Sequence, residues 1–228
     1  MRLLNFKYLL VGVLVLSNAA WSANPHIGIL IFDGVLTSDV VAPAEVFGVA
    51  SRQAWFKDYN VVFISVEDKK QISTEEGLVL TPDYHIGNVP ALDVLILPSS
   101  YEMKWLFKNE KLTAFIQGQS KSVAWLASNC SGAFLLANAG LLDGKKATTW
   151  YGGEKDLQKA YPNVNVIEDQ NLVVDGNIIT SNGSLVSYQA ALVLLAKMSS
   201  KSRAKEVFDA LQMARITNWS DITQYLED

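Results

Sequence analysis

The stretch "WLASNCSGAFLLANAGLLDG", residues 125–144, joins a strand-like apolar run to a helix-like apolar run through Ser-Asn-Cys-Ser-Gly. A tight strand-to-helix turn of this kind is typical of a nucleophile elbow, which lifts one side chain to the C-terminal edge of a sheet. Cys130 is then the nucleophile, the Ser131 N–H is an oxyanion donor, and Gly132 lets the helix pack close to the strand. The alternative is a buried cysteine that serves only as a small core residue.

The segments on both sides of this turn alternate between strand-like and helix-like patterns. Strands are expected at 26–32, 59–67, 92–98 and 122–128, and helices at 39–51, 101–119, 132–140, 156–161, 185–198 and 203–214. Turn residues predict a small hairpin around 77–82 and a second one over 171–181, where Asp-Gly-Asn separates two apolar runs. Such an alternation predicts an α/β protein with a mostly parallel sheet and helices on both faces.

The composition fits one well-buried domain. Half of the 228 residues are hydrophobic, 18% are charged and the net charge is −4. These values argue against a disordered chain, and the acidic balance lacks the basic footprint of a nucleic-acid binder.

The N-terminus has the three parts of a secretory signal peptide: a basic start, a continuous apolar run and a small polar end. We expect a signal peptide over residues 1–23, cleaved within 19–23, and a single domain over 24–228. The apolar run is too short for a membrane span, so the mature protein is expected to be periplasmic or secreted. A single cysteine in an exported chain indicates a free reactive thiol or an intermolecular disulfide.

Three segments resemble the PfpI/ThiJ superfamily, and in particular the branch of isonitrile hydratases and of the sensor domains of AraC-type regulators. They are "FDGVLTSDVVAPAEVFGVA", "NCSGAFLLANAGLLDGKKATT" and "DGNIITSNGSLVSYQAALVLLAKM". The resemblance covers residues 26 to about 200. It implies a class I glutamine-amidotransferase-like fold, which is a flavodoxin-like three-layer sandwich. It also implies a small-molecule ligand or substrate and a homodimer; no cofactor and no metal are expected.

Asp39 matches the acid that lies beside the cysteine in the isonitrile hydratase branch. A partly desolvated carboxyl group near a thiol can hold a proton and hydrogen-bond the thiolate. The alternative is that Asp39 only caps the helix that begins there. Glu45 also matches a family acid, but six residues along a helix is a rotation of about 240°, so both cannot face one site. Glu45 is therefore expected to be a structural or interface residue.

The sequence departs from the family next to the thiol. Many relatives carry histidine after Ala-Thr-Thr, where this chain has Trp150. Trp150 is expected to form an aromatic wall of the pocket or to pack in the core. His26 and His85 are both expected at the N-terminal edge of the sheet, away from Cys130. This placement excludes a Cys–His dyad, and with it a Cys–His peptidase.

A second departure lies at "LPSS", residues 97–100, where relatives usually have Pro-Gly-Gly. Ser99 and Ser100 still offer N–H groups but have less backbone freedom than glycine. The oxyanion hole is therefore altered or recruits a hydroxyl group. Gln189 replaces a frequent aspartate at a position that we expect to be structural.

Two functions remain open. One is a cysteine-dependent small-molecule enzyme of the isonitrile hydratase (hydro-lyase) type, with Cys130 as nucleophile and Asp39 as acid/base. The other is a non-catalytic ligand-binding or redox-sensing protein related to the regulators' sensor domains. The chain ends at Asp228 without a helix-turn-helix segment, so we expect no nucleic-acid partner, and no membrane contact after signal cleavage.

Overall fold

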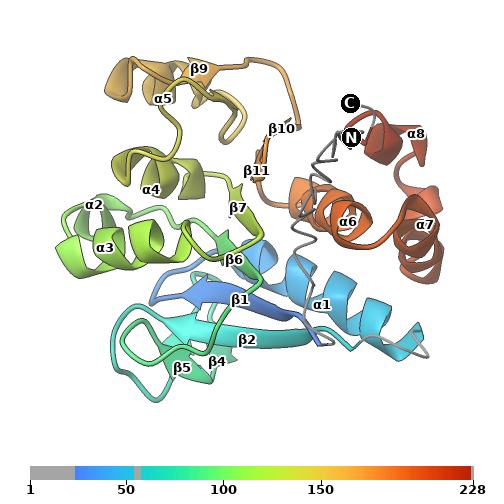
Figure 1. Cartoon of the computed structure of the whole chain (residues 1–228), viewed down its shortest axis with the longest axis horizontal. Coiled ribbons are helices and arrows are strands. Elements are labelled where there is room, and N and C mark those ends of the chain that lie inside the picture. The colour runs from blue at the N-terminus through green and yellow to red at the C-terminus, as the bar shows by residue number, and fades with distance from the viewer. Residues whose placement is uncertain (1–23, 54–57, 227–228) are drawn as a thin grey trace, which may run out of the picture.

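The architecture is a mostly parallel sheet with helices on both faces, as the sequence predicts (Figure 1). The computed structural model describes residues 24–53 and 58–226. The predicted signal peptide lies outside the described residues. Within the described part of the chain, no helix is both long enough and apolar enough to cross a membrane.

The main sheet contains seven strands in the order β10-β11-β7-β6-β1-β2-β5. Every neighbouring pair is parallel except the β10–β11 hairpin. These strands are β1 (His26–Ile31), β2 (Asn60–Ser65), β5 (Tyr84–His85), β6 (Val94–Leu97), β7 (Trp125–Asn129), β10 (Leu172–Asp175) and β11 (Ile178–Ser181). Two small sheets pair β3 (Ile72–Ser73) with β4 (Val79–Leu80) and β8 (Lys146–Ala147) with β9 (Asn165–Val166).

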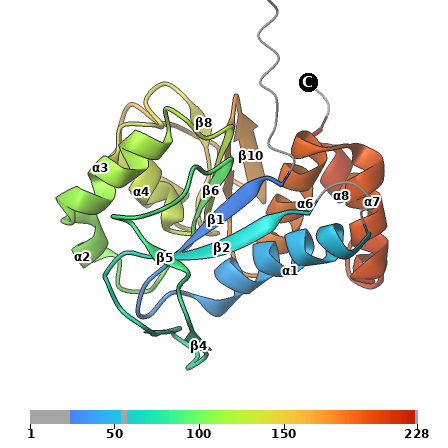
Figure 2. The ribbon, with the colours of Figure 1, turned by 60° about the horizontal axis from the view of Figure 1, so that its bottom comes forward.

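The helices form two layers, which Figure 2 shows on opposite sides of the sheet. One layer holds α1 (Thr37–Gln53), α6 (Val186–Met198) and α7 (Lys201–Ala210), and the other holds α2 (Lys104–Phe107), α3 (Glu110–Gln119) and α4 (Gly132–Asn138). The remaining helices are α5 (Glu154–Ala160), the 3₁₀ turn η1 (Met213–Arg215) and α8 (Ser220–Thr223). With helices on both faces, β1 is buried almost throughout, which explains its continuous apolar sequence.

One predicted helix is divided in two. The segment expected to be helical over 101–119 forms α2 and α3. The division lies at Asn109, whose side-chain oxygen accepts a hydrogen bond from Leu112 N at 3.1 Å. Asparagine is a strong N-cap, so it begins a new helix rather than continuing the old one.

The expected position of His85 is wrong. His26 opens β1, as expected, but His85 lies in β5 beside Ser65, the last residue of β2. It is therefore at the C-terminal end of the sheet, the same end as Cys130. Three strands (β6, β1 and β2) separate β5 from β7, a lateral distance of roughly 19 Å at the usual strand spacing. His85 is thus excluded from the cysteine site by its edge position.

Candidate active site

Cys130 lies on a sharp turn between β7 and α4, with a backbone φ of 51°. This left-handed conformation is unfavourable for a residue with a side chain, by about 1–3 kcal/mol, and persists only where neighbours hold it. Two hydrogen bonds do so. Cys130 N donates to Ser181 O at 2.9 Å, and Thr149 Oγ1 donates to Cys130 O at 2.8 Å. The strained turn is the feature expected of a nucleophile elbow.

Gly132 allows α4 to begin directly against the neighbouring strand. A Cβ atom on Gly132 would lie 2.1 Å from Leu97 O and 3.0 Å from Pro98 O. These are backbone atoms of β6 and the loop after it, and they cannot move aside independently. Only glycine fits here, so this residue sets how closely the loops after β6 and β7 approach each other.

Asp39 is fully buried in the first turn of α1. Its Oδ2 accepts from Ser99 Oγ at 2.5 Å and from Ser99 N at 3.2 Å. Its Oδ1 accepts from Ser184 N and from Ser187 Oγ, both at 3.0 Å. The carboxylate therefore bonds to the loops after β6 and β11 and to the first turn of α6, and none of these four donors is an N–H of α1. The interpretation as a simple helix cap does not hold.

The backbone of Asp39 is tied to the elbow as well. Pro43 has no N–H, so the Asp39 carbonyl lacks the helical donor that position 43 would normally supply. Asn129 Nδ2 donates to this carbonyl at 3.1 Å, and Asn129 Oδ1 accepts from Ser181 Oγ at 2.7 Å. The residue before the nucleophile thus takes the place of the missing helical hydrogen bond and joins α1 to β7 and β11.

Burial governs the protonation of both titratable groups. Desolvation raises the pKa of Asp39, although the four hydrogen bonds from Ser99, Ser184 and Ser187 act in the opposite direction. Desolvation also raises the pKa of Cys130, and the charge of Asp39 adds to that rise. Hydrogen bonds from Ser99 and from Ser131 lower the thiol pKa, but less. Burial therefore outweighs the stabilisation of a thiolate that the N-terminal end of α4 would provide.

A pocket of about 970 Å³ opens above the thiol. Cys130, Ser131, Ser100 and Trp150 line it, whereas Asp39, Ser99 and Gly132 lie behind its surface. Ser131 Oγ donates to Ser100 O at 3.3 Å, which links the two serines. The site residues predicted from the sequence therefore lie together. Some of them line the pocket, and the others lie directly behind its surface.

Aromatic side chains dominate one wall of the pocket. The ring of Phe134 stacks on Trp150 at a centroid distance of 5.3 Å and on Phe107 at 6.0 Å. All three residues line the pocket. At its rim, Tyr101 and Tyr151 are 75% and 80% exposed. Trp150 thus forms a wall of the pocket and packs on a core side chain at the same time.

Several site residues were not anticipated. Ser184, Ser187 and Asn182 follow β11, which is the parallel neighbour of β7. The polar run Ser-Asn-Gly-Ser after an apolar strand could have indicated them, because the C-terminal ends of neighbouring parallel strands lie at the same edge of the sheet as Cys130. Glu45 lies outside the pocket and accepts a hydrogen bond from Tyr188 Oη at 2.7 Å, consistent with its expected structural role.

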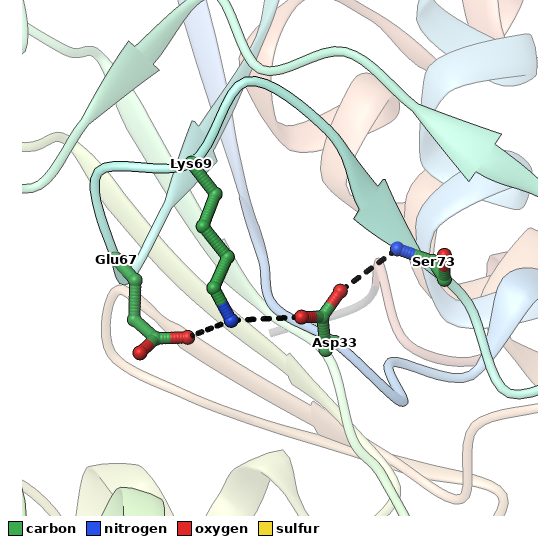
Figure 3. A network of polar contacts seen from close by, with 4 residues as sticks. All are labelled: Asp33, Glu67, Lys69 and Ser73. Atoms are coloured by element: carbon green, nitrogen blue, oxygen red, sulfur yellow. Dashed lines mark hydrogen bonds and ion pairs between the residues drawn. The ribbon is translucent and has the colours of Figure 1, made fainter.

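The loop that leads into α1 is fixed on its outer side by an exposed polar network (Figure 3). Lys69 Nζ lies 2.8 Å from Asp33 Oδ2 and 2.6 Å from Glu67 Oε2. Asp33 Oδ1 accepts from Ser73 N at 2.9 Å, which attaches the β3–β4 hairpin to this loop. The lysine and the Ser73 N–H lower the pKa of Asp33. This network supports the position of α1 from outside the site.

The fold and the elbow define an α/β protein with a single cysteine at the C-terminal edge of a parallel sheet, backed by a buried carboxylate. Residues 25–197 match the model of the DJ-1/PfpI family, and the chain belongs to that family.

The relatives with similar sequences include both an enzyme and a transcriptional regulator. The chain is 30% identical to an isonitrile hydratase of Pseudomonas putida over 190 residues, which are 83% of this chain and 78% of that protein. It is 27% identical to the HTH-type transcriptional regulator GbdR of Pseudomonas aeruginosa over 199 residues, which are 87% of this chain. The aligned region makes up about half (53%) of that regulator.

Solved structures agree on the fold. A ThiJ/PfpI family protein from Pseudomonas syringae superimposes with a TM-score of 0.73 at 22% identity, over 89% of this chain and 79% of that one. DJ-1beta of Drosophila melanogaster gives a TM-score of 0.72 at 20% identity, over 83% of this chain and 98% of that one. At such identities the likeness establishes the fold alone.

Proposed function

We propose that the protein is a cysteine-dependent small-molecule enzyme of the isonitrile hydratase type, with Cys130 as nucleophile and Asp39 as acid/base. The observation that carries this proposal is the strained Cys130 at the base of a large pocket with the fully buried Asp39 behind it. The similarity to an isonitrile hydratase over most of both chains supports the choice of reaction.

The chemistry follows from the two groups. The Cys130 proton passes to Asp39, and the thiolate attacks the terminal carbon of an isonitrile, R–N≡C. Asp39 returns the proton to that carbon, which gives a thioimidate, R–N=CH–S–Cys. Water then adds across the C=N bond, and expulsion of the thiol leaves the formamide R–NH–CHO. No leaving amine is released, so the cycle needs no histidine to protonate one.

The pocket favours neutral substrates. Its inner wall is aromatic and aliphatic, and its charged lining residues, Glu102 and Lys104, are exposed. An apolar substituent R can pack on Phe134 and Trp150, which directs the terminal carbon toward Cys130.

A screen of isonitriles, 2-oxoaldehydes and small amides tests the proposal. We expect formamide production from a neutral isonitrile such as benzyl isonitrile, and loss of turnover in Cys130→Ala and Cys130→Ser. Full turnover of a confirmed substrate by Cys130→Ala would contradict the role of the thiol.

The second candidate is a ligand-binding or redox-sensing protein, and its support is the similarity to the regulator GbdR over 87% of this chain. The raised pKa of Cys130 favours the enzyme, because a mostly protonated thiol oxidises slowly and needs a nearby base to react. Saturable binding of a neutral ligand without repeated turnover would favour the sensor.

We also propose that the protein is exported, which rests on the sequence pattern of residues 1–23. Fractionation of cells that produce the full chain, with mass spectrometry of the mature N-terminus, tests this. A first residue between 20 and 24 is expected, and an intact Met1 in the cytoplasm would contradict it.

A further inference from the structure

Exposed apolar side chains gather at the mouth of the Cys130 pocket. Among the described residues, four large hydrophobic side chains are 73–80% exposed: Tyr101, Tyr151, Leu185 and Ile216. The first three line the pocket, and Ile216 does not. Single exposed apolar side chains are ordinary on a protein surface, whereas a group of them at a cavity is typical of a binding site.

The sheet order places these side chains around the opening. β11 and β6 are the two neighbours of β7, the strand that leads into Cys130. Leu185 follows β11 and Tyr101 follows β6, so their loops flank Cys130 on opposite sides. Tyr151 comes from a third segment, after β8. We call Tyr101, Tyr151 and Leu185 the rim.

The apolar lining continues beneath the rim. Leu36, Met103 and Phe134 also line the pocket, and all three are buried. The partly exposed rings of Phe107 and Trp150 add to this lining and stack on Phe134. The lining therefore offers apolar contacts from its buried base to its exposed rim.

The polar side chains of the lining already have partners within the protein. Asn182 Nδ2 donates to Thr149 O. Asn171 Nδ2 donates to Gln189 Oε1 at 3.3 Å, and Ser131 Oγ donates to a backbone carbonyl of the loop after β6 at 3.3 Å. A polar substituent would lose its water and gain few free partners here, so the lining favours an apolar one.

The pocket is also large. Its volume of about 970 Å³ is near the upper end of the range for sites that enclose a drug-sized ligand, roughly 300–1,000 Å³. A benzyl group can contact the aromatic wall, but it fills only a small part of this space.

We propose that the apolar lining and the rim form one subsite for a large apolar substituent, which extends from Cys130 to the rim. The preferred ligands are then neutral molecules with such a substituent. For the proposed reaction they are isonitriles, R–N≡C, in which R is considerably larger than benzyl. This choice of substrate rests on the proposed function, whereas the subsite itself does not.

A series of N-alkylformamides, from N-butyl to N-decyl, measures the extent of the subsite. Formamides are the products of the proposed reaction, so isothermal titration calorimetry can follow their binding to the wild-type protein without turnover. Each CH₂ group that leaves water should raise the affinity about threefold. We expect the rise to continue beyond N-hexylformamide and to reach at least about tenfold between N-hexyl and N-decyl.

Variants of the rim show whether this gain comes from the subsite. Tyr151→Ser and Leu185→Ser each remove an exposed apolar side chain, so the fold should be retained. Each should weaken binding of N-decylformamide by about threefold or more, and the double variant by about tenfold or more. Binding of N-butylformamide should change by less than about twofold, because the shorter chain does not reach the rim.

Ile216→Ser is the matched control. It removes an apolar side chain of similar exposure away from the pocket, and it should leave both affinities within about twofold of the wild type.

The inference is overturned if the affinity levels off at N-hexylformamide, or if the double rim variant binds N-decylformamide within about twofold of the wild type. If that variant also loses a dimer that sedimentation shows for the wild type, the rim is a contact between two copies of the chain instead.

Binding and turnover can fail separately. A dependence on chain length in a protein that converts no isonitrile would contradict the proposed function and keep the subsite. Turnover of benzyl isonitrile by a protein whose formamide affinity levels off at N-hexyl would keep the proposed function and contradict the subsite.

Discussion

Two aspartates of one loop-and-helix segment have opposite environments. Asp33 is exposed, pairs with Lys69 and has a lowered pKa. Asp39, six residues later, is fully buried among serine hydroxyl and backbone N–H donors and has a raised pKa. A cation would hold Asp39 permanently ionised. Because its hydrogen-bond donors are neutral and the site is buried, Asp39 can accept a proton. Cys130 needs such a base, since burial keeps its thiol protonated.

The largest contrast is expected in turnover. Asp39→Asn keeps the shape of the side chain but cannot accept the Cys130 proton, so kcat/KM for an accepted isonitrile should fall by roughly 100-fold or more. Asp33→Asn should change it by less than about twofold, because the surface network only supports the loop. Steady-state kinetics of both variants measure the contrast, and equal losses would remove the distinction between the two carboxylates.

The close packing around the buried carboxylate gives the next largest effect. Gly183 has a φ of 79°, and a Cβ there would meet Cys130 Cβ at 2.5 Å. Gly183→Ala should therefore lower the free energy of unfolding by about 2 kcal/mol or more. Gly77→Ala is the matched control, since Gly77 has a φ of 86° but nothing within 4 Å of the new Cβ. Its cost should be about 1 kcal/mol. Urea unfolding measures both losses, and equal losses in the two variants would show that the surroundings of Asp39 and Cys130 are not closely packed.

Stability should depend on pH with opposite signs at the two aspartates. Because the Asp39 pKa is raised, its protonation stabilises the fold below the ordinary value of 3.8, and this contribution is lost as pH rises through the folded pKa. Because the Asp33 pKa is lowered, its contribution is present above 3.8 and is lost as pH falls through the folded pKa.

Urea unfolding of wild type, Asp39→Asn and Asp33→Asn between about pH 3 and pH 8 measures these slopes. As pH rises, the stability of the wild type relative to Asp39→Asn should fall, and its stability relative to Asp33→Asn should rise. The same sign for both differences would contradict the contrast between buried and exposed carboxylates.

The smallest effect is expected at the surface network. Lys69→Met removes the cation between Asp33 and Glu67, whose side chains are about half exposed. Exposed ion pairs contribute little, so the loss in unfolding free energy should be below about 1 kcal/mol and should shrink further in high salt. A loss of several kcal/mol that persists in high salt would show that this network is energetically part of the core.

The sequence predicts the elbow and the central strands because their signals are local. Five consecutive residues, Ser-Asn-Cys-Ser-Gly, are enough to predict the turn at Cys130, and β1 is predicted by one short apolar run. The position of His85 was missed because β5 has only two residues, too few for any periodic pattern. The position of a short edge strand is determined by its pairing with the neighbouring strand rather than by its own sequence.

The polar contacts of the site were harder to predict because they join residues far apart in the chain. Ser187 lies 148 residues from Asp39, and Asn129 lies 90 residues from it. Pro43 deprives the Asp39 carbonyl of its helical donor, but the sequence does not show which side chain supplies one instead. Ser99 was recognised as a departure from the family, whereas its bond to Asp39 required the register of β6 on β7.

The central claim is that Asp39 takes the proton of Cys130, and the sign of one change in rate tests it. The measurement is the rate of iodoacetamide alkylation of Cys130 at about pH 7 in wild type and in Asp39→Asn. If Asp39 acted only as a nearby negative charge, its removal would lower the thiol pKa and speed the reaction. If Asp39 accepts the proton, its removal slows the reaction, by about tenfold or more. We predict that alkylation of Cys130 is slower in Asp39→Asn than in the wild type, and an equal or faster rate in the variant would contradict the account.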